Sequence, residues 1–314
     1  MSGLSVLSEW IVPDEEIDHL GHMSMVFYGR RAERGAVGLI EALAGGPWAL
    51  DEAGLMAVVA DRHIHFRREQ LKGAPLVLRG GAFAAHTDRI EVYVEIANSA
   101  DNTTAAMGRL GVRLQDRATR SWRPIPSAWL DRADRGLIEA PNRSRPRTLA
   151  REKLGVDATL DDFAAAGIAS HLRRRITAEM CDADGFIAPP PPRTWTKPSD
   201  VKLGVMDQVW EAAPGFAWPV VETRDLILRT ARQWDVLESY AVLLGVEARF
   251  IHWGSWVFEA KSGALVSTTH QVNIFFDLAA RRGGDMPADL RRRLESFARP
   301  DWPPVRQRTA TASP

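Results

Sequence analysis

Asp18-His19-Leu20-Gly21-His22-Met23-Ser24 is the most informative stretch of this sequence, because its opening returns as Asp182-Ala183-Asp184-Gly185 at a shift of 164 residues. Residues 62–67 likewise match residues 224–229 at a shift of 162, and residues 116–120 match residues 277–281 at a shift of 161. Each match alone is short enough to arise by chance. Their common order and nearly constant shift indicate a tandem duplication, in which two similar units follow one another along the chain.

Both halves also predict the same order of secondary structure. After Ser24 the apolar residues recur with helical spacing as far as Ala44, and Gly45-Gly46-Pro47 ends the pattern. Gly35 and Gly38 lie inside this predicted helix, where either close approach of a sheet or simple tolerance explains them. Alternating apolar and polar residues predict strands before and after the helix of each half. We expect these strands over residues 6–12, 56–67, 76–85, 90–96 and 105–116, then 173–178, 220–230, 236–246, 248–258 and 265–277, with a second helix near 199–212.

One helix preceded by a strand and followed by four antiparallel strands makes an α+β unit, with the helix on one face of a sheet. We therefore predict an N-terminal repeat over residues 1–140 and a C-terminal repeat over residues 171–299. Residues 141–170 form the linker, which begins as an exposed segment over 141–147 and continues with short surface helices over 149–154 and 160–166. Residues 300–314 are expected to form a disordered tail.

The overall composition predicts a soluble protein of a reducing compartment. Lysine plus arginine and aspartate plus glutamate both number 40, so no global field attracts nucleic acid or an anionic membrane. No apolar run is long enough to span a bilayer, and Met1-Ser2-Gly3-Leu4 lacks the regions of a signal peptide. Cys181 is the only cysteine, which excludes an intrachain disulfide and a cysteine-based zinc cage. We expect a cytoplasmic protein that binds neither nucleic acid nor membrane.

The Asp18 stretch, together with Tyr28 and Glu33-Arg34, resembles the entry motif of the 4-hydroxybenzoyl-CoA thioesterase group of hotdog proteins. That group carries an Asp-x-x-Gly-His-x-Asn loop, a tyrosine four residues later and often an acidic residue further along the helix. Ser24 departs from the pattern, since asparagine is common there. In the second half Phe186 stands in place of the histidine, and prolines over residues 189–192 interrupt the expected start of the helix.

The resemblance implies a double hotdog, two tandem repeats that each wrap a curved antiparallel β-sheet around a long helix. It also implies that the two repeats pair, with ligand sites in the clefts between them, one headed by Asp18 and one by Asp182. The substrate implied is an acyl thioester of coenzyme A, with CoA as part of the substrate and no cofactor. The fused pair would be a monomeric pseudo-dimer or would assemble further as a homo-oligomer.

A thioester hydrolase needs a nucleophile or activated water, donors for the developing oxyanion and a fixed position for the acyl group. Asp18 can attack the carbonyl directly or act as general base on water. Backbone N–H groups at the start of the following helix would face the oxyanion, and Gly21 would allow the carbonyl to approach the backbone closely. The residues expected to bind substrate are Gly21, Met23, Ser24, Gly185 and Phe186.

Each catalytic candidate also has a purely structural interpretation. Asp18 can instead cap the helix or form a turn, and His22 can position the loop rather than transfer a proton. Glu33 is either the acidic residue of the family helix or an ion-pair partner of the arginines around it. Asp182 or its neighbour Asp184 heads a second site or belongs to an acidic turn. Cys181 has no histidine near it in sequence, so we do not expect a thiol nucleophile.

Two histidine pairs, His19-x-x-His22 and His63-x-His65, have the spacing of metal ligands. His63 and His65 would lie on one face of a strand, with Ile64 on the other. Neither pair is accompanied in sequence by the acidic residues of a usual hydrolytic zinc site, so we expect no metal. Several arginines either contact CoA phosphates or form a solvated basic face, namely Arg143, Arg145, Arg147 and Arg151 in the linker and Arg173 to Arg175 after it.

The function expected from these residues is acyl-CoA hydrolysis, and two alternatives stay open. One is a hotdog enoyl-CoA hydratase, although its usual Asp and His pair in a differently spaced loop is not found in the sequence. The other is a non-catalytic acyl-CoA-binding module, since the fold does not fix the function. The sequence does not choose between CoA and an acyl carrier protein.

Overall fold

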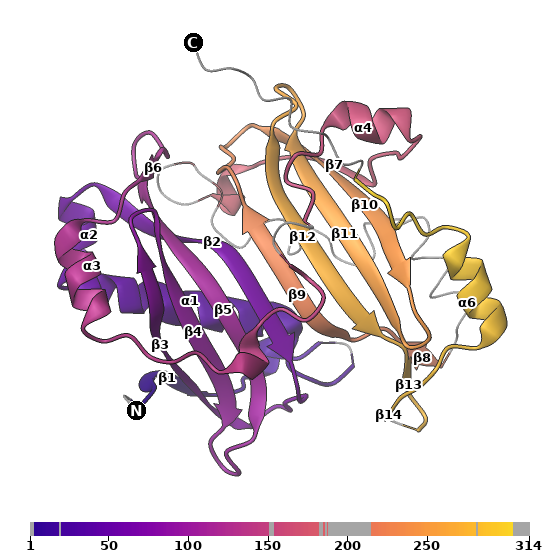
Figure 1. Cartoon of the computed structure of the whole chain (residues 1–314), viewed down its shortest axis with the longest axis horizontal. Coiled ribbons are helices and arrows are strands. Elements are labelled where there is room, and N and C mark those ends of the chain that lie inside the picture. The colour runs from indigo at the N-terminus through magenta and orange to yellow at the C-terminus, as the bar shows by residue number, and fades with distance from the viewer. Residues whose placement is uncertain are drawn as a thin grey trace.

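The computed structural model describes residues 3–18, 20–150, 154–181, 185, 187, 215–280 and 282–303. Within these residues the chain forms two similar halves that share one sheet (Figure 1). Among the described helices, none is long and apolar enough to cross a membrane.

The first half contains a central helix and a five-stranded antiparallel arrangement around it. The order along the chain is β1 (Ser5–Ile11), a 3-10 turn (Asp14–Glu16), α1 (Met25–Ala44), α2 (Pro47–Glu52), β2 (Leu55–Phe66), β3 (Pro75–His86), β4 (Arg89–Asn98), β5 (Thr104–Asp116), β6 (Trp122–Arg123) and α3 (Ser127–Asp134). The predicted helix and strands of this half are all present, with ends that differ by two residues at most.

The second half repeats this order after the linker. The linker itself contains a 3-10 turn (Asn142–Ser144) and α4 (Leu160–Ala165). The described elements of the second half are β7 (Leu172–Arg175), a 3-10 turn (Ala178–Met180), β8 (Phe216–Ala217), β9 (Val220–Ile227), β10 (Val236–Val246), β11 (Phe250–Glu259), β12 (Leu265–Ile274), β13 (Phe276–Asp277), β14 (Arg282–Gly283) and α6 (Ala288–Glu295). The second long helix, predicted near residues 199–212, lies outside the described residues.

The main sheet has a palindromic strand order, which is the structural signature of a paired duplication. Its path runs β1-β3-β4-β5-β2 through the first half and β9-β12-β11-β10-β7 through the second, so β2 and β9 meet in the middle. These two strands pair antiparallel from Asp61–Leu226 to His65–Glu222. Arg62 binds Asp225 and Arg224 binds Asp61 across this junction, each at 2.8 Å. The two repeats therefore form one continuous antiparallel sheet.

Local turns confirm that both halves are copies of one unit. A β-bridge between Ile17 and Met23 closes the Asp18 loop, and a bridge between Cys181 and Ile187 closes its counterpart at the same shift of 164 residues. Each loop contains a glycine with positive φ, +86° at Gly21 and +76° at Gly185. A left-handed backbone favours glycine, so the repeated motif has a conformational cause in both halves.

Helix α1 packs its apolar side onto the first half of the sheet (Figure 1). Ala36 and Ile40 are fully buried in this interface. A Cβ on Gly35 would lie 2.3 Å from Leu78 Cδ2, whereas nothing lies within 4 Å of the equivalent point on Gly38. Close approach of the sheet therefore explains Gly35, and tolerance explains Gly38.

The linker differs from the exposed segment that the sequence predicted. Helix α4 is present, but its Phe163 is fully buried against Trp256 and Phe258 of the second half. Residues 149, 150 and 154 of the other predicted helix are not helical, and the residues between them lie outside the described part. The first residues of the predicted tail also pack, because Trp302 meets the Phe163 ring edge-on with centroids 4.8 Å apart. The linker is thus part of the core on the sheet face opposite α6.

Candidate active site

The Asp18 loop is a tight turn held by its own backbone. The Asp18 amide donates to the His22 carbonyl at 2.8 Å, and the Gly21 amide donates to the Asp18 carbonyl at 3.0 Å. The Met23 amide donates to Gln70 on the chain that leaves β2, which ties the loop to the sheet. Gly21 takes the positive φ that the turn requires. The loop therefore presents Asp18 from a fixed backbone just before α1 begins.

The two oxygens of the Asp18 carboxylate differ in their hydrogen bonds. Oδ1 accepts the Leu20 amide at 2.9 Å, as in an Asx turn, so the turn-forming interpretation holds for this atom. Oδ2 has no hydrogen-bond partner among the described residues, and 30% of the side chain is exposed. The helix N-cap is Ser24, not Asp18. One oxygen orients the group while the other stays open for chemistry.

His22 lies between two carboxylates. Its Nδ1 is 3.9 Å from Asp18 Oδ1, and its Nε2 is 3.3 Å from Glu69 Oε2. The ring is 15% exposed, and its contacts fit a residue that positions the loop. Glu69 was not singled out in the sequence, because its link to the loop depends on how the chain leaves β2. Its neighbour Arg68 offers a carbonyl to the Tyr28 hydroxyl at 3.4 Å.

Tyr28, the aromatic residue of the motif, closes the inner side of the loop. It is 4% exposed and meets the Phe66 ring edge-on with centroids 5.8 Å apart. Burial raises the pKa of its hydroxyl well above the usual range, and the nearby Glu69 and Asp18 act in the same direction. The tyrosine is therefore a neutral hydrogen-bond donor at physiological pH.

The two remaining candidates of the first repeat, Ser24 and Met23, differ in their exposure. Ser24 is partly exposed at the helix start and makes no side-chain capping bond, so its hydroxyl lies at the candidate site. Met23 is only 4% exposed and packs into the core below α1. Its side chain therefore packs with the core cluster beside the loop.

Glu33 lies in the middle of α1 and not at the helix start that follows the loop. It is nine residues beyond Ser24 on α1, which corresponds to about 13 Å of helix. Its carboxylate pairs with Arg62, which also binds Asp225 of the second half. Burial raises the pKa of Glu33 even though Arg62 opposes the shift. The ion-pair interpretation therefore describes this residue, and Gly29 leaves the room that the Arg62 side chain needs.

The second candidate site is described only at its edges. Asp182, Asp184 and Phe186 lie outside the described residues. Gly185 is described, and its carbonyl accepts the Gln233 amide at 2.8 Å. The Cys181 thiol lies 3.4 Å from the Thr177 carbonyl.

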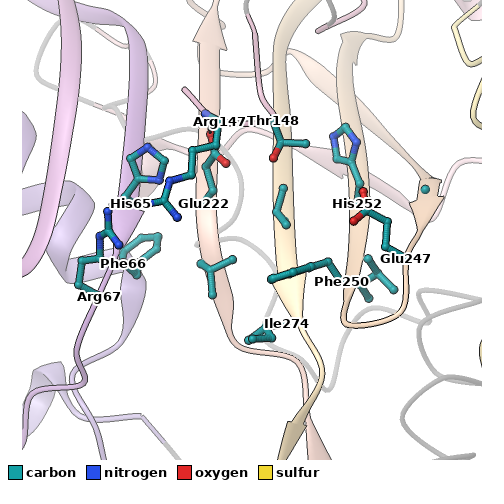
Figure 2. A pocket seen from close by; sticks show the side chains of 14 residues that line it. His65, Phe66, Arg67, Arg147, Thr148, Glu222, Glu247, Phe250, His252 and Ile274 are labelled. Atoms are coloured by element: carbon teal, nitrogen blue, oxygen red, sulfur yellow. Dashed lines mark hydrogen bonds between the residues drawn. The ribbon is translucent and has the colours of Figure 1, made fainter. Parts of the chain in front are cut away.

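A cavity of about 560 Å³ lies where β2, the linker and the second half of the sheet meet. Figure 2 shows its two sides, with His65, Phe66 and Arg67 from the end of β2 facing Glu247, Phe250 and His252 from the second half. Phe66 also meets the ring of Tyr28 on α1, the helix that follows the Asp18 loop.

Two arginines of this cavity have no carboxylate partner among the described residues. They are Arg67 and the linker residue Arg147 (Figure 2). Desolvation and the nearby Arg147 lower the pKa of Arg67. By contrast, Arg143 pairs with Glu95 at 2.8 Å and Arg173 with Glu238 at 3.2 Å. Of the arginines proposed from sequence, Arg147 is the one placed in the cavity, while Arg151 lies outside the described residues.

The pair His63 and His65 gains an acidic neighbour that the sequence did not reveal. His63 Nε2 lies 2.8 Å from Glu222 Oε1, across the β2–β9 junction. Together the three residues bring ligand-capable atoms within 4.8 Å of one another, and all three are buried. The sequence predicted no metal because no acidic residue accompanies the pair along the chain. The structure supplies that acidic residue, so this reason against a metal no longer holds. His19 of the other pair lies outside the described residues.

Comparison with known proteins agrees with this architecture. The acyl-ACP thioesterase of Bacteroides thetaiotaomicron superposes with a TM-score of 0.58 at 10% identity, covering 85% of this chain and 96% of its own. A putative oleoyl thioesterase of Lactobacillus plantarum gives 0.61 at 11% identity, covering 87% and 96%. The 12:0-ACP thioesterase of Umbellularia californica gives 0.59 at 11% identity, covering 86% and 93%. The chain has the double hotdog fold.

Residues 12–133 of this double hotdog protein match the thioesterase-like superfamily. That range contains the Asp18 loop, α1 and all of β2 to β5, so the resemblance stated from the loop is confirmed. No curated protein matches the sequence. The superpositions show the fold, but at 10–11% identity they do not show the substrate, which has to be inferred from the site.

Proposed function

We propose that this double hotdog protein hydrolyses acyl-CoA thioesters at the Asp18 loop. The observation that carries the proposal is the arrangement of the Asp18 carboxylate, with Oδ1 fixed by the Leu20 amide and Oδ2 open at a partly exposed position. The superfamily match over residues 12–133 supports thioester hydrolysis as the reaction class.

The chemistry follows from what the loop offers. Asp18 Oδ2 takes a proton from water as the water attacks the thioester carbonyl, or it attacks the carbonyl itself to give an anhydride that water then cleaves. Both routes release the CoA thiol and a carboxylate. His22 holds the loop between Asp18 and Glu69 in either route.

The oxyanion would be stabilised at the start of α1. The loop amides are largely used already, since Gly21 donates to the Asp18 carbonyl, Met23 to the Gln70 carbonyl and Ser24 to the Glu16 carbonyl. We expect an oxyanion donor among the backbone amides of the first turn of α1, at the positive end of the helix dipole. In other acyl-transfer enzymes one such donor contributes roughly 3 kcal/mol of transition-state stabilisation.

The junction cavity supports CoA as the carrier of the acyl group. Among the described residues, Arg67 and Arg147 place two guanidinium groups without carboxylate partners in a cavity whose Phe66 contacts Tyr28 of α1. Guanidinium groups bind phosphates through paired N–H donors. The cavity lies between the repeats, where the ligand of a paired hotdog is expected.

The proposal is tested by free-thiol release from purified full-length protein. The panel contains short, long and aromatic acyl-CoAs, the matching acyl-pantetheines without phosphates, and an acyl carrier protein loaded with the same acyl groups. Release from acyl-CoA that exceeds release from acyl-pantetheine is the expected result. Faster thiol release from the acyl carrier protein would show that the carrier protein, and not CoA, carries the acyl group of the substrate. Water addition to an enoyl-CoA without thiol release would establish a hydratase, and tight acyl-CoA binding without any turnover would establish a binding module.

A further inference from the structure

The histidine pair on β2 lies on the sheet face opposite α1. Ile64 points into the core beneath the helix, while His65 faces the linker and bonds the Arg145 carbonyl through Nε2 at 3.0 Å. The exposed fractions of His63 and His65 are 1% and 3%. Because residues i and i+2 of a strand share a face, both rings lie side by side, with centroids 4.5 Å apart.

The third residue comes from the other repeat. Glu222 stands opposite His65 in the β2–β9 register, which places its carboxylate beside both rings. The side chain is 3% exposed, and its Oε1 also accepts the Arg147 amide at 3.1 Å. Glu222 is thus held between β2 and the linker.

We propose that His63, His65 and Glu222 form a transition-metal site, with zinc as the best fit, at the junction of the two repeats. Two histidines and one carboxylate match the ligand types of zinc sites that keep an open position. Their ligand-capable atoms lie within 4.8 Å of one another. Tetrahedral zinc with bonds of about 2.0–2.1 Å holds its ligand atoms roughly 3.3 Å apart, so modest side-chain rotations bring the set into place.

The surroundings of His65 match those of a metal ligand. A ligating histidine usually donates its second ring nitrogen to a carbonyl or carboxylate, which fixes the ring. The bond from His65 Nε2 to the Arg145 carbonyl supplies this contact and leaves Nδ1 for the metal.

A simple hydrogen-bonded pair of His63 and Glu222 is the competing explanation. It accounts for two of the three residues but gives no role to the His65 ring, whose centroid lies 4.5 Å from that of His63. It also gives no reason for His65 and Glu222 to line a cavity of about 560 Å³. That cavity gives the open coordination position access to a ligand.

The charge of the cavity indicates what that ligand is. Arg67 and Arg147 line the same space, and because both are exposed, solvent screens much of their repulsion with a metal ion. Together with the metal they favour an anion as the fourth ligand, such as a phosphate or carboxylate. The metal proposal does not depend on hydrolysis at Asp18, since its measurement is binding.

The test is metal binding by the full chain after dialysis against EDTA. Zinc titration is followed by calorimetry, and cobalt(II) titration is followed by its visible d–d absorption, which reports coordination number. The wild type should bind one equivalent in a four- or five-coordinate site. His65→Ala and Glu222→Gln should weaken binding by at least about 100-fold, beyond the roughly 10–100-fold that loss of an outer hydrogen-bond partner costs.

His252→Ala is the matched control. His252 lines the same cavity but pairs with His270 at 3.2 Å, away from the proposed ligands, so this variant should bind metal as the wild type does. Circular dichroism checks that each variant is folded. A wild type that binds no metal would overturn the proposal without reference to any variant. Binding that survives His65→Ala, or that is lost only with His252→Ala, would overturn it as well.

Discussion

Replacing Arg62 with methionine should destabilise the protein more than any loss of a surface ion pair. Arg62 donates to Asp225 Oδ2 through Nε at 3.1 Å and Nη2 at 2.8 Å, and its Nη1 contacts Glu33. The side chains are 11%, 6% and 12% exposed, respectively. One guanidinium therefore neutralises two buried carboxylates, one on α1 and one on the second repeat.

The loss of stability follows from the two carboxylates that remain without the Arg62 guanidinium. Methionine fills much of the space but removes the counter-charge from Glu33. Asp225 loses both guanidinium bonds and keeps the bond from the Thr269 hydroxyl at 2.6 Å. Removing one partner of a buried ion pair costs about 3–5 kcal/mol, because an uncompensated charge stays out of water. An exposed pair such as Arg173–Glu238 contributes only about 0–1 kcal/mol.

Urea unfolding at pH 7 measures both effects, with Arg173→Met as the matched control. We expect Arg62→Met to lower the free energy of unfolding by about 3–5 kcal/mol and Arg173→Met by less than about 1 kcal/mol. Adding Glu33→Gln and Asp225→Asn to Arg62→Met should recover part of the loss, because no buried charge is then left unpaired. Equal effects of the two arginine substitutions, or no recovery in the triple variant, would refute this reasoning.

Three further perturbations test other parts of the structure. Gly35→Ala should be about 1–3 kcal/mol less stable in urea than Gly38→Ala, because only the first new methyl group overlaps the sheet; equal stabilities would contradict the packing account. Phe163→Ala should cost about 3–5 kcal/mol, whereas a linker helix that only lay on the surface would lose less than about 1 kcal/mol. Burial lowers the pKa of His65 to about 4 in the folded protein, against about 6.5 in the unfolded chain. The metal-free protein should therefore keep its full stability above pH 6.5 and lose up to roughly 3 kcal/mol as the pH falls toward 4. His65→Gln should flatten this pH dependence of the free energy of unfolding, and an unchanged slope would exclude a neutral buried histidine.

The sequence predicted the fold well where one unit carries a local periodic signal. The shift of 164 residues between Asp18 and Asp182 reappears as the paired bridges Ile17–Met23 and Cys181–Ile187. Strand and helix ends follow because alternation and helical spacing are local properties. Gly35 was left undecided, because only the position of Leu78 on β3 shows what a side chain there would meet.

Long-range contacts explain what the sequence could not supply. Glu222 lies 159 positions from His63, and the antiparallel register of β2 and β9 alone brings them together. From the sequence, Glu33 could be either catalytic or ion-paired, because its contact with Arg62 depends on how α1 packs against β2. The linker looked exposed because its polar residues dominate, although Phe163 anchors it in the core. Such pairings depend on topology, which periodicity does not encode.

Hydrolysis at Asp18 is tested most directly by the rate of thiol release from the best acyl-CoA substrate in the wild type and in Asp18→Asn. Asparagine preserves the Oδ1 contact to the Leu20 amide but removes the open carboxylate oxygen. Asp14→Asn is the control, since Asp14 is an exposed partner of Lys72 close by in the chain. We predict that Asp18→Asn lowers kcat/KM by about 10²–10⁴-fold while the control keeps wild-type activity. Unchanged turnover in folded Asp18→Asn would contradict the assignment of the reaction to this loop.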